Sequence, residues 1–185
     1  MGGALVVTVF GSSRPHEGDA DYEEARILGR CLAKHGFFVC SGGYGGVMEA
    51  VSRGAKEAGG KTFGVTAEFF KAAKLNAWID VEVRRESWEE RLFELIRRAD
   101  GFVACKGGTG TLVELAVVWE MLNKSVMSEK PFAVLGDFWQ PVLDRVREVE
   151  LGHPASWGEA NRRLVYRATS PGDVANHLAM KLKQT

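Results

Sequence analysis

The chain has 185 residues, a length that fits one domain and allows a substantial buried core. Hydrophobic residues make up 45% of it and charged residues 26%, which is typical of a globular protein and excludes a disordered or fibrous one. Lys plus Arg equal Asp plus Glu at 24 each, so no overall basic charge attracts nucleic acid or an anionic membrane surface. We therefore expect no nucleic-acid or membrane partner, and any bound anion must be held locally.

The first apolar stretch, residues 4–10, follows no basic leader and is too short to span a bilayer. The three cysteines, Cys31, Cys40 and Cys105, show neither CxxC spacing nor a nearby histidine cluster. This pattern argues against both a disulfide framework and a zinc site. Together these features predict a cytoplasmic protein without a bound metal.

Short, β-rich apolar runs alternate with helical stretches, a pattern typical of βαβ units and a parallel sheet. The runs are continuously apolar, which indicates that helices cover both faces of that sheet. We therefore predict an α/β fold: a Rossmann-like, doubly wound, mainly parallel sheet in a single domain over residues 1–185. The predicted strands are residues 4–10, 37–40, 62–66, 101–105 and 132–135.

Helical periodicity fills the gaps between these strands. The first helix places Tyr22, Ala25, Leu28 and Leu32 on one face, and the second runs from about residue 46 to residues 59–60. A third follows Ser87, whose spacing to Glu90 fits a capping box, and a fourth covers residues 109–122. Residues 164–166 and 171–183 are predicted as a last strand and helix. The aperiodic connection 67–80 has the length of a lid or binding loop.

The first of two glycine-rich loops, residues 41–46, directly follows a predicted strand and opens a predicted helix. Glycines let the backbone approach a ligand, and the positive end of a helix attracts phosphate. The loop matches neither the GxGxxG fingerprint nor a P-loop, so neither NAD binding nor ATP hydrolysis is indicated. A tight turn without a ligand explains it equally well. Its candidate binding residues are Gly42, Gly43, Tyr44, Gly45 and Gly46.

The second loop, residues 106–111, also leaves a strand and opens a helix. Two such loops at the carboxyl ends of parallel strands point to the crevice where doubly wound folds bind ligands. Ser12 and Ser13 follow the first strand at the same edge, although a helix-entry turn explains them equally well. We expect a nucleotide or another phosphorylated small molecule as ligand. The candidate residues of the second loop are Lys106, Gly107, Gly108, Thr109, Gly110 and Thr111.

Two charged residues on predicted helices allow both a structural and a functional interpretation. Glu114 follows Thr111 by three residues, which satisfies a capping box, but it also shares a helical line with apolar Val117 and Val118. A carboxylate on a covered face near a phosphate loop is a candidate site group. Arg91 lies at the edge of an apolar stripe, where it either serves the site or extends to solvent.

Residues 107–114, GGTGTLVE, resemble the PGGxGTxxE motif of the LOG (LONELY GUY) family of cytokinin riboside 5'-monophosphate phosphoribohydrolases, some of which are labelled lysine decarboxylases. Residues 7–13 and 42–48 resemble the family's opening strand and first glycine loop, and residues 88–92 fall where the family has MxxRK. The resemblance covers roughly residues 5–145. Molybdenum-cofactor carrier proteins are similar too. The sequence departs from the family motifs at Trp88, Leu92, Lys106 and Val113.

The resemblance implies that Arg91 and Glu114 form the catalytic pair, acting on the N-glycosidic bond of a nucleoside 5'-monophosphate to release free base and ribose 5-phosphate. A carboxylate such as Glu114 can stabilise the oxocarbenium-like sugar cation or activate water. Arg91 is then expected to hold the phosphate or sugar and to keep Glu114 ionised. This chemistry requires no metal and no organic cofactor.

Two alternatives use the same loops. A carrier or nucleotide sensor would bind the phosphorylated ligand without hydrolysing it. The decarboxylase label is favoured least, because pyridoxal chemistry needs a Schiff-base lysine and Lys106 is the one lysine beside the predicted pocket. We also expect a homodimer, because helix 112–122 is apolar almost all round and because members of the LOG family form dimers.

Overall fold

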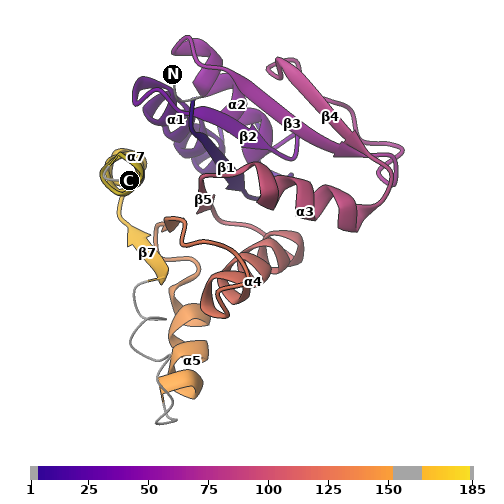
Figure 1. Ribbon diagram of the computed structural model, residues 1–185. Coiled ribbons are helices and arrows are strands. Elements are labelled where there is room, and N and C mark those ends of the chain that lie inside the picture. Colours follow the sequence, from indigo (N-terminus) through magenta and orange to yellow (C-terminus); the bar gives the residue numbers. More distant parts are fainter. Residues whose placement is uncertain (1–3, 152–163, 184–185) are drawn as a thin grey trace.

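The computed structural model describes residues 4–151 and 164–183. Its centre is a seven-stranded sheet in the order β4-β3-β2-β1-β5-β6-β7, and every neighbouring pair is parallel (Figure 1). The predicted doubly wound α/β fold is therefore confirmed. The strands are β1 (Val6–Phe10), β2 (Phe38–Ser41), β3 (Thr62–Ala67), β4 (Val81–Arg85), β5 (Gly101–Ala104), β6 (Phe132–Leu135) and β7 (Val165–Ala168).

Helices cover both faces of the sheet, as the continuously apolar strands predict. One face packs against α1 (Ala20–Lys34), α2 (Val47–Glu57) and α7 (Pro171–Leu182). The other packs against α3 (Trp88–Arg98), α4 (Thr109–Asn123) and α5 (Gln140–Leu151) (Figure 1). Among the described residues, none of these helices combines the length and the apolar character needed to cross a membrane.

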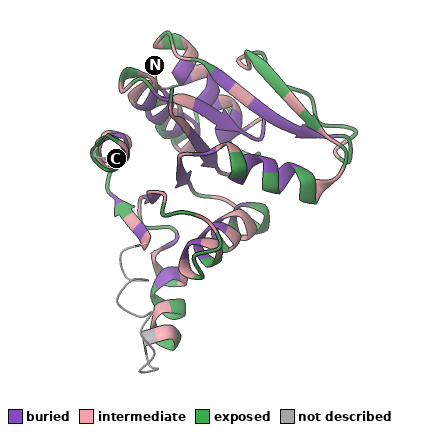
Figure 2. Cartoon of the chain, viewed as in Figure 1, coloured by how far each residue is buried: buried purple, intermediate pink, exposed green. Residues whose placement is uncertain are grey.

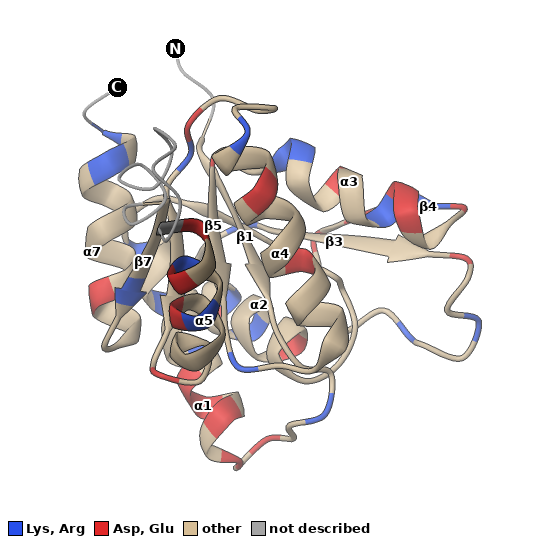
Figure 3. Cartoon of the chain, turned by 90° about the horizontal axis from the view of Figure 1, so that it is seen from below, with Lys and Arg blue, Asp and Glu red and all other residues tan. Residues whose placement is uncertain are grey.

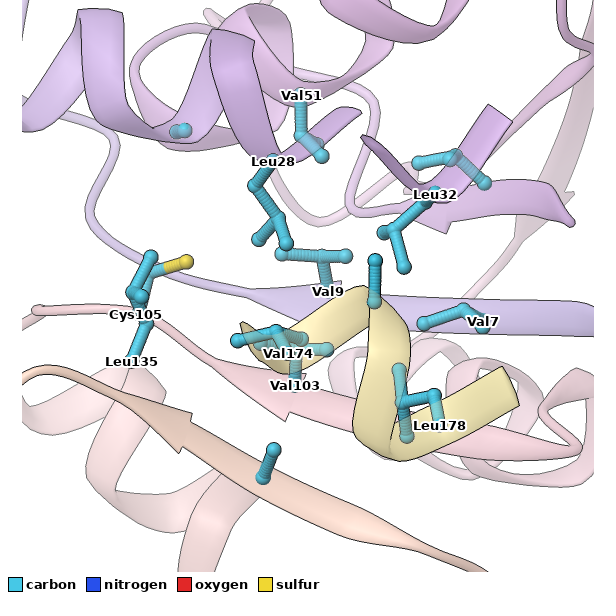
Figure 4. Close-up of a cluster of buried hydrophobic side chains, with 14 of the residues drawn as sticks. Val7, Val9, Leu28, Leu32, Val51, Val103, Cys105, Leu135, Val174 and Leu178 are labelled. Carbon is cyan, nitrogen blue, oxygen red and sulfur yellow. The ribbon is translucent and has the colours of Figure 1, made fainter. Parts of the chain in front are cut away.

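Each sheet face has its own hydrophobic cluster. On the α1 side, Val9 and Val103 from the central strands pack with Leu28 of α1 and Val174 of α7 (Figure 4). On the other side, the ring of Phe102 lies between those of Phe10 and Phe132, at centroid distances of 6.1 and 5.9 Å. Successive strand residues thus enter opposite cores, which is why no polar alternation shows in the sequence.

Two elements have no counterpart in the sequence prediction: β4 at the edge of the sheet and α5. Charged residues and valines alternate along β4, most of it is exposed, and it pairs on one side only, with β3 (Figure 2). Helix α5 is rich in charge, and acidic and basic side chains are intermixed along it (Figure 3). Neither segment has the long apolar run that identified the central elements. The capping box of Ser87 and Glu90 at the start of α3 is confirmed.

Strands β2 to β4 are added on one side of β1 and strands β5 to β7 on the other, and this switch in strand order brings three loops to one edge of the sheet. The Ser12 N–H donates to the carbonyl of Lys106 at 3.2 Å. The Ser12 carbonyl in turn accepts from the Val47 N–H at 2.8 Å. The loop after β1 is therefore tied both to the second glycine loop and to the start of α2, which follows the first. This is where doubly wound folds bind ligands.

Candidate functional site

A cavity of about 1090 Å³ opens at this switch point. Its wall is built from the loop after β1, the loop and first turns at the start of α4, and the inward face of α3. The structure therefore brings together side chains from distant parts of the sequence. The sequence-predicted residues that line the cavity are Ser12, Ser13, Tyr44, Arg91, Lys106, Gly107, Gly108, Thr109, Gly110, Thr111 and Glu114.

The start of α4 leaves backbone N–H groups available to an anion. Gly108 is the N-cap, no side chain caps it, and the first turn contains no acidic residue. The first N–H groups of a helix have no intrahelical acceptor and lie at its positive end, so an anion at this position is favoured. Thr111 is the third residue of the helix and its side chain is buried. The Thr111–Glu114 capping box is therefore wrong, and Glu114 lies in the second turn.

The first glycine loop lies behind the cavity wall. Tyr44 lines the cavity, whereas the four neighbouring glycines, Gly42, Gly43, Gly45 and Gly46, do not. Gly46 adopts a φ of 70°, and a Cβ there would collide with the Ser12 carbonyl. A Cβ on Gly42 would collide with the Arg91 guanidinium. The need for glycine at these two positions thus follows from contacts within the protein.

Arg91 is buried in the wall, with 7% of its surface exposed. Its Nε donates to the Val65 carbonyl at 2.8 Å, and its guanidinium carbon lies 5.4 Å from the Tyr44 ring centroid and 5.6 Å from that of Phe70. These contacts fix the guanidinium by a hydrogen bond and by cation–π attraction. Extension of Arg91 to solvent, one of the two sequence interpretations, is therefore wrong.

Glu114 faces Arg91 from α4, with its Oε1 3.9 Å from Nη1 of Arg91. Its side chain is 15% exposed, and burial raises the pKa of Glu114 to about 7, an effect that Arg91 opposes only in part. Burial likewise lowers the pKa of Arg91, which Glu114 opposes. The expectation that Arg91 keeps Glu114 ionised needs correction, because desolvation outweighs the attraction and Glu114 is only partly ionised at pH 7.

Lys106 reaches the mouth of the cavity, where its charge is already paired. Its Nζ lies 2.9 Å from Oδ2 of Asp21, at the acidic start of α1 (Figure 3). The hydrogen bond to Asp21 raises the pKa of Lys106, whose side chain is 54% exposed. An incoming anion thus meets a lysine–carboxylate pair at this position, so the remaining positive charge of the cavity wall comes from the helix terminus, Arg91 and Arg14.

The sequence reasoning missed an aromatic part of the wall. Phe70 and Ala73, from the connection between β3 and β4, line the cavity together with Trp88 and Phe138. Phe70 contacts Tyr44 edge to face at a centroid distance of 5.7 Å. The available signal was the aromatic pair at positions 69–70 in a long connection without periodicity. The length of that connection by itself predicts only a lid or binding loop.

Comparison with known proteins agrees with this architecture. The model of the SLOG cluster4 family matches residues 4–149. The cytokinin riboside 5'-monophosphate phosphoribohydrolase LOG of Oryza sativa subsp. japonica is 32% identical over 173 residues, covering 89% of this chain and 67% of the relative. The enzyme of the same name from Mycobacterium marinum is 32% identical over 137 residues, covering 70% and 73%. An uncharacterised protein of Archaeoglobus fulgidus is 31% identical over 121 residues, covering 64% and 78%.

Solved structures with this fold include molybdenum-cofactor proteins. The molybdenum cofactor binding protein of Rippkaea orientalis superposes with a TM-score of 0.72 and 25% identity, over 98% of both chains. The molybdenum cofactor carrier protein of Chlamydomonas reinhardtii reaches a TM-score of 0.70 at 21% identity, covering 98% of this chain and 99% of that one, which shows the shared fold alone. The chain therefore belongs to the SLOG cluster4 family and is a relative of the cytokinin riboside 5'-monophosphate phosphoribohydrolases.

Proposed function

We propose that the protein hydrolyses the N-glycosidic bond of a nucleoside 5'-monophosphate, releasing the free base and ribose 5-phosphate. The observation that carries the proposal is the facing pair of the buried Arg91 and the partly buried Glu114 in the wall of a cavity that also contains an uncapped helix terminus. Relatives from Oryza sativa and Mycobacterium marinum are named for a reaction of this class.

In this proposal the 5'-phosphate binds at the start of α4. The N–H groups of Thr109, Gly110 and Thr111 supply donors at the positive end of the helix, and the hydroxyls of Ser12 and Ser13 line the same cavity. Because Glu114 lies little more than one helical turn beyond this terminus, a phosphate held there places the attached ribose near the carboxylate.

The chemical step breaks the bond between C1' of the ribose and the base nitrogen, and the bonding electrons leave with the base. The sugar passes through an oxocarbenium-like cation, which the ionised Glu114 stabilises. A water oxygen then bonds to C1' and loses a proton to Glu114, which returns it to solvent, and the departing base takes up one proton from solvent, so one water molecule is consumed in total. Arg91 holds the ribose or its phosphate. A carboxylate with a pKa of about 7 suits proton transfer at neutral pH.

A panel of nucleoside 5'-monophosphates, analysed by chromatography for released base and ribose 5-phosphate, tests the proposal. We expect one or more of them to be cleaved, and the corresponding nucleosides without phosphate to be cleaved far more slowly, because they cannot use the α4 terminus. If the wild-type protein releases no base from any monophosphate, the hydrolase proposal is wrong.

The second candidate function is a carrier of a phosphorylated ligand. It is favoured by the similarity to the molybdenum cofactor binding protein of Rippkaea orientalis, which extends over 98% of both chains. A carrier binds its ligand in the same cavity and returns it unchanged. Binding of a nucleotide or a phosphorylated pterin without any product is the result that would favour it.

We also propose a cytoplasmic homodimer. A reducing compartment preserves free thiols such as those of Cys31, Cys40 and Cys105. The dimer is supported by α4, which leaves Leu112 36% exposed beside an exposed Ala116. Both residues line a groove of about 180 Å³ between α4 and α5, and a second copy would cover this apolar surface.

A further inference from the structure

Two aromatic residues of the cavity, Tyr44 and Phe70, lie beyond the charged pair, as seen from the start of α4. Glu114 follows that helix terminus, Arg91 faces Glu114, and the guanidinium of Arg91 lies over the rings of Tyr44 and Phe70. One cavity thus runs from anion-binding N–H groups, past two charges, to an aromatic wall. A nucleotide has the same order of chemical groups: phosphate, sugar and planar base.

Phe70 is positioned by the loop of residues 68–78, which rests on the first glycine loop. The Asn76 side-chain nitrogen donates to the carbonyls of Gly43 and Tyr44 at 3.1 and 2.9 Å, and the Asn76 N–H donates to Gly43 at 2.9 Å. The Phe70 N–H donates to Ala67 at 3.2 Å, and the Ala73 N–H donates to Phe70 at 3.0 Å. Hydrogen bonds therefore fix the loop at both ends.

Tyr44 is locked in the same way. Its hydroxyl donates to the Ala67 carbonyl at 3.2 Å and accepts from the Ala67 N–H at 2.9 Å. This bonding uses the polar group of the side chain and leaves its ring in the cavity wall, against Phe70. The first glycine loop thus contributes Tyr44 to the cavity wall and is hydrogen-bonded to the loop that contributes Phe70.

We infer that Phe70 and Trp88 form a compartment that binds the heterocyclic base of the nucleotide by stacking, with residues 42–46 as the support of the base-binding loop. The inference rests on the proposed function and names the part of the cavity that selects the base. Cavities for small ligands measure about 300–1,000 Å³, so the 1090 Å³ here leaves room for a purine. Stacking on aromatic side chains accepts any planar base and is strongest for the larger rings.

Calorimetric titration with adenosine 5'-monophosphate and with ribose 5-phosphate separates base binding from phosphate binding. The Glu114→Gln variant serves as the background so that no base is released during the titration. We expect Phe70→Ala to weaken the nucleotide about tenfold, which corresponds to about 1.4 kcal/mol and lies within the range of base–aromatic stacking. Ribose 5-phosphate has no base, so its affinity should change less than about twofold.

Phe69→Ala is the matched control, because Phe69 is the adjacent phenylalanine of the same loop, is 67% exposed and does not line this cavity. It should leave both affinities unchanged. Ala73→Trp is the complementary variant. Ala73 is exposed and lines the cavity, so a bulky side chain there should exclude the base and spare ribose 5-phosphate.

The results distinguish the base compartment from the proposed hydrolysis. If Phe70→Ala weakens both ligands equally, Phe70 acts through Arg91, and the base compartment is overturned. The same conclusion follows if neither affinity changes. If the wild-type protein binds the nucleotide but releases no adenine, and Phe70→Ala weakens nucleotide binding as expected, the proposed hydrolysis is contradicted and the base compartment is supported. Wild-type protein that binds no purine monophosphate contradicts both.

Discussion

Nη1 of Arg91 lies 3.9 Å from Oε1 of Glu114, so the two charges face each other without a direct hydrogen bond. Arg91 is anchored through its Nε to Val65, and within the described residues no hydrogen bond reaches the Glu114 carboxylate. Both groups therefore keep bonding capacity for a third partner. A sugar hydroxyl beside the pair can contact the carboxylate and the guanidinium together.

Glu114→Gln should nearly abolish base release while largely preserving nucleotide binding. The amide keeps the shape of the side chain but removes the charge that stabilises the sugar cation. We expect kcat to fall by on the order of a hundredfold or more, which is roughly 3 kcal/mol of transition-state stabilisation. Single-turnover assays and calorimetry measure the two effects separately. Retention of most of the wild-type kcat would show that Glu114 does not act in the chemical step.

The pH dependence of catalysis should follow Glu114. Because its pKa is raised to about 7 and the ionised form acts, kcat/KM should rise with pH and level off above about 7. Arg91→Met removes the neighbouring positive charge that lowers the pKa of Glu114, so the midpoint should move to higher pH. KM should also rise, because the variant loses its grip on the ground-state sugar or phosphate. If the midpoint of the kcat/KM profile is the same in Arg91→Met as in the wild type, the titrating group is not Glu114.

The same carboxyl should make stability depend on pH. Between pH 4.5 and about 7 the unfolded chain has lost the Glu114 proton while the folded chain still binds it, so stability falls as pH rises through this window. Glu114→Gln removes this penalty. At pH 8 its free energy of unfolding should exceed that of the wild type by up to about 3 kcal/mol, and the advantage should vanish near pH 4. Urea denaturation at the two pH values measures the difference, and an equal change at both would assign it to packing.

The parallel sheet could be predicted because its central strands are buried on both faces, and apolar runs identify such strands. Strand β4 could not, since it lies at the edge, is mostly exposed and carries charged residues alternating with valine. The approximate start of α4 was predicted correctly, but its capping was not. A Thr-x-x-Glu spacing is local, whereas the position of Thr111 in the third place of the helix depends on how the preceding glycines turn.

The candidate site shows the same division. The second glycine loop and the pair of Arg91 and Glu114 could be identified from the sequence alone, because they lie in recognisable motifs. The burial of Arg91 depends on Tyr44 and Phe70, which come from two other loops. Likewise, the glycines of the first loop look equivalent to those of the second. They differ in the folded chain, where the first loop packs against Arg91 and Ser12 and the long connection is hydrogen-bonded to it through Asn76.

Ala116→Arg should dissociate the proposed dimer. The exposed Ala116 lines the groove between α4 and α5, where a charged side chain would be desolvated in an interface. We expect sedimentation to show a dimer for the wild type and a monomer for the variant at micromolar concentration. Val149→Arg is the control, because Val149 is 65% exposed on α5 but does not line the groove. A monomeric wild type would contradict the dimer directly.

Gly107→Ala and Gly45→Ala should separate the two glycine loops in phosphate binding. A Cβ at Gly107 would collide with the side chain of Thr111, and the start of α4 must shift to accommodate it. A Cβ at Gly45 would meet its nearest neighbour, the Ser13 carbonyl, at an ordinary 3.9 Å. The second loop holds the phosphate in our proposal, so Gly107→Ala should weaken ribose 5-phosphate by about tenfold or more, the loss of roughly one charge-assisted hydrogen bond. Gly45→Ala should bind it like the wild type. The reverse ranking of the two dissociation constants, measured by calorimetry, would place the phosphate on the first loop instead.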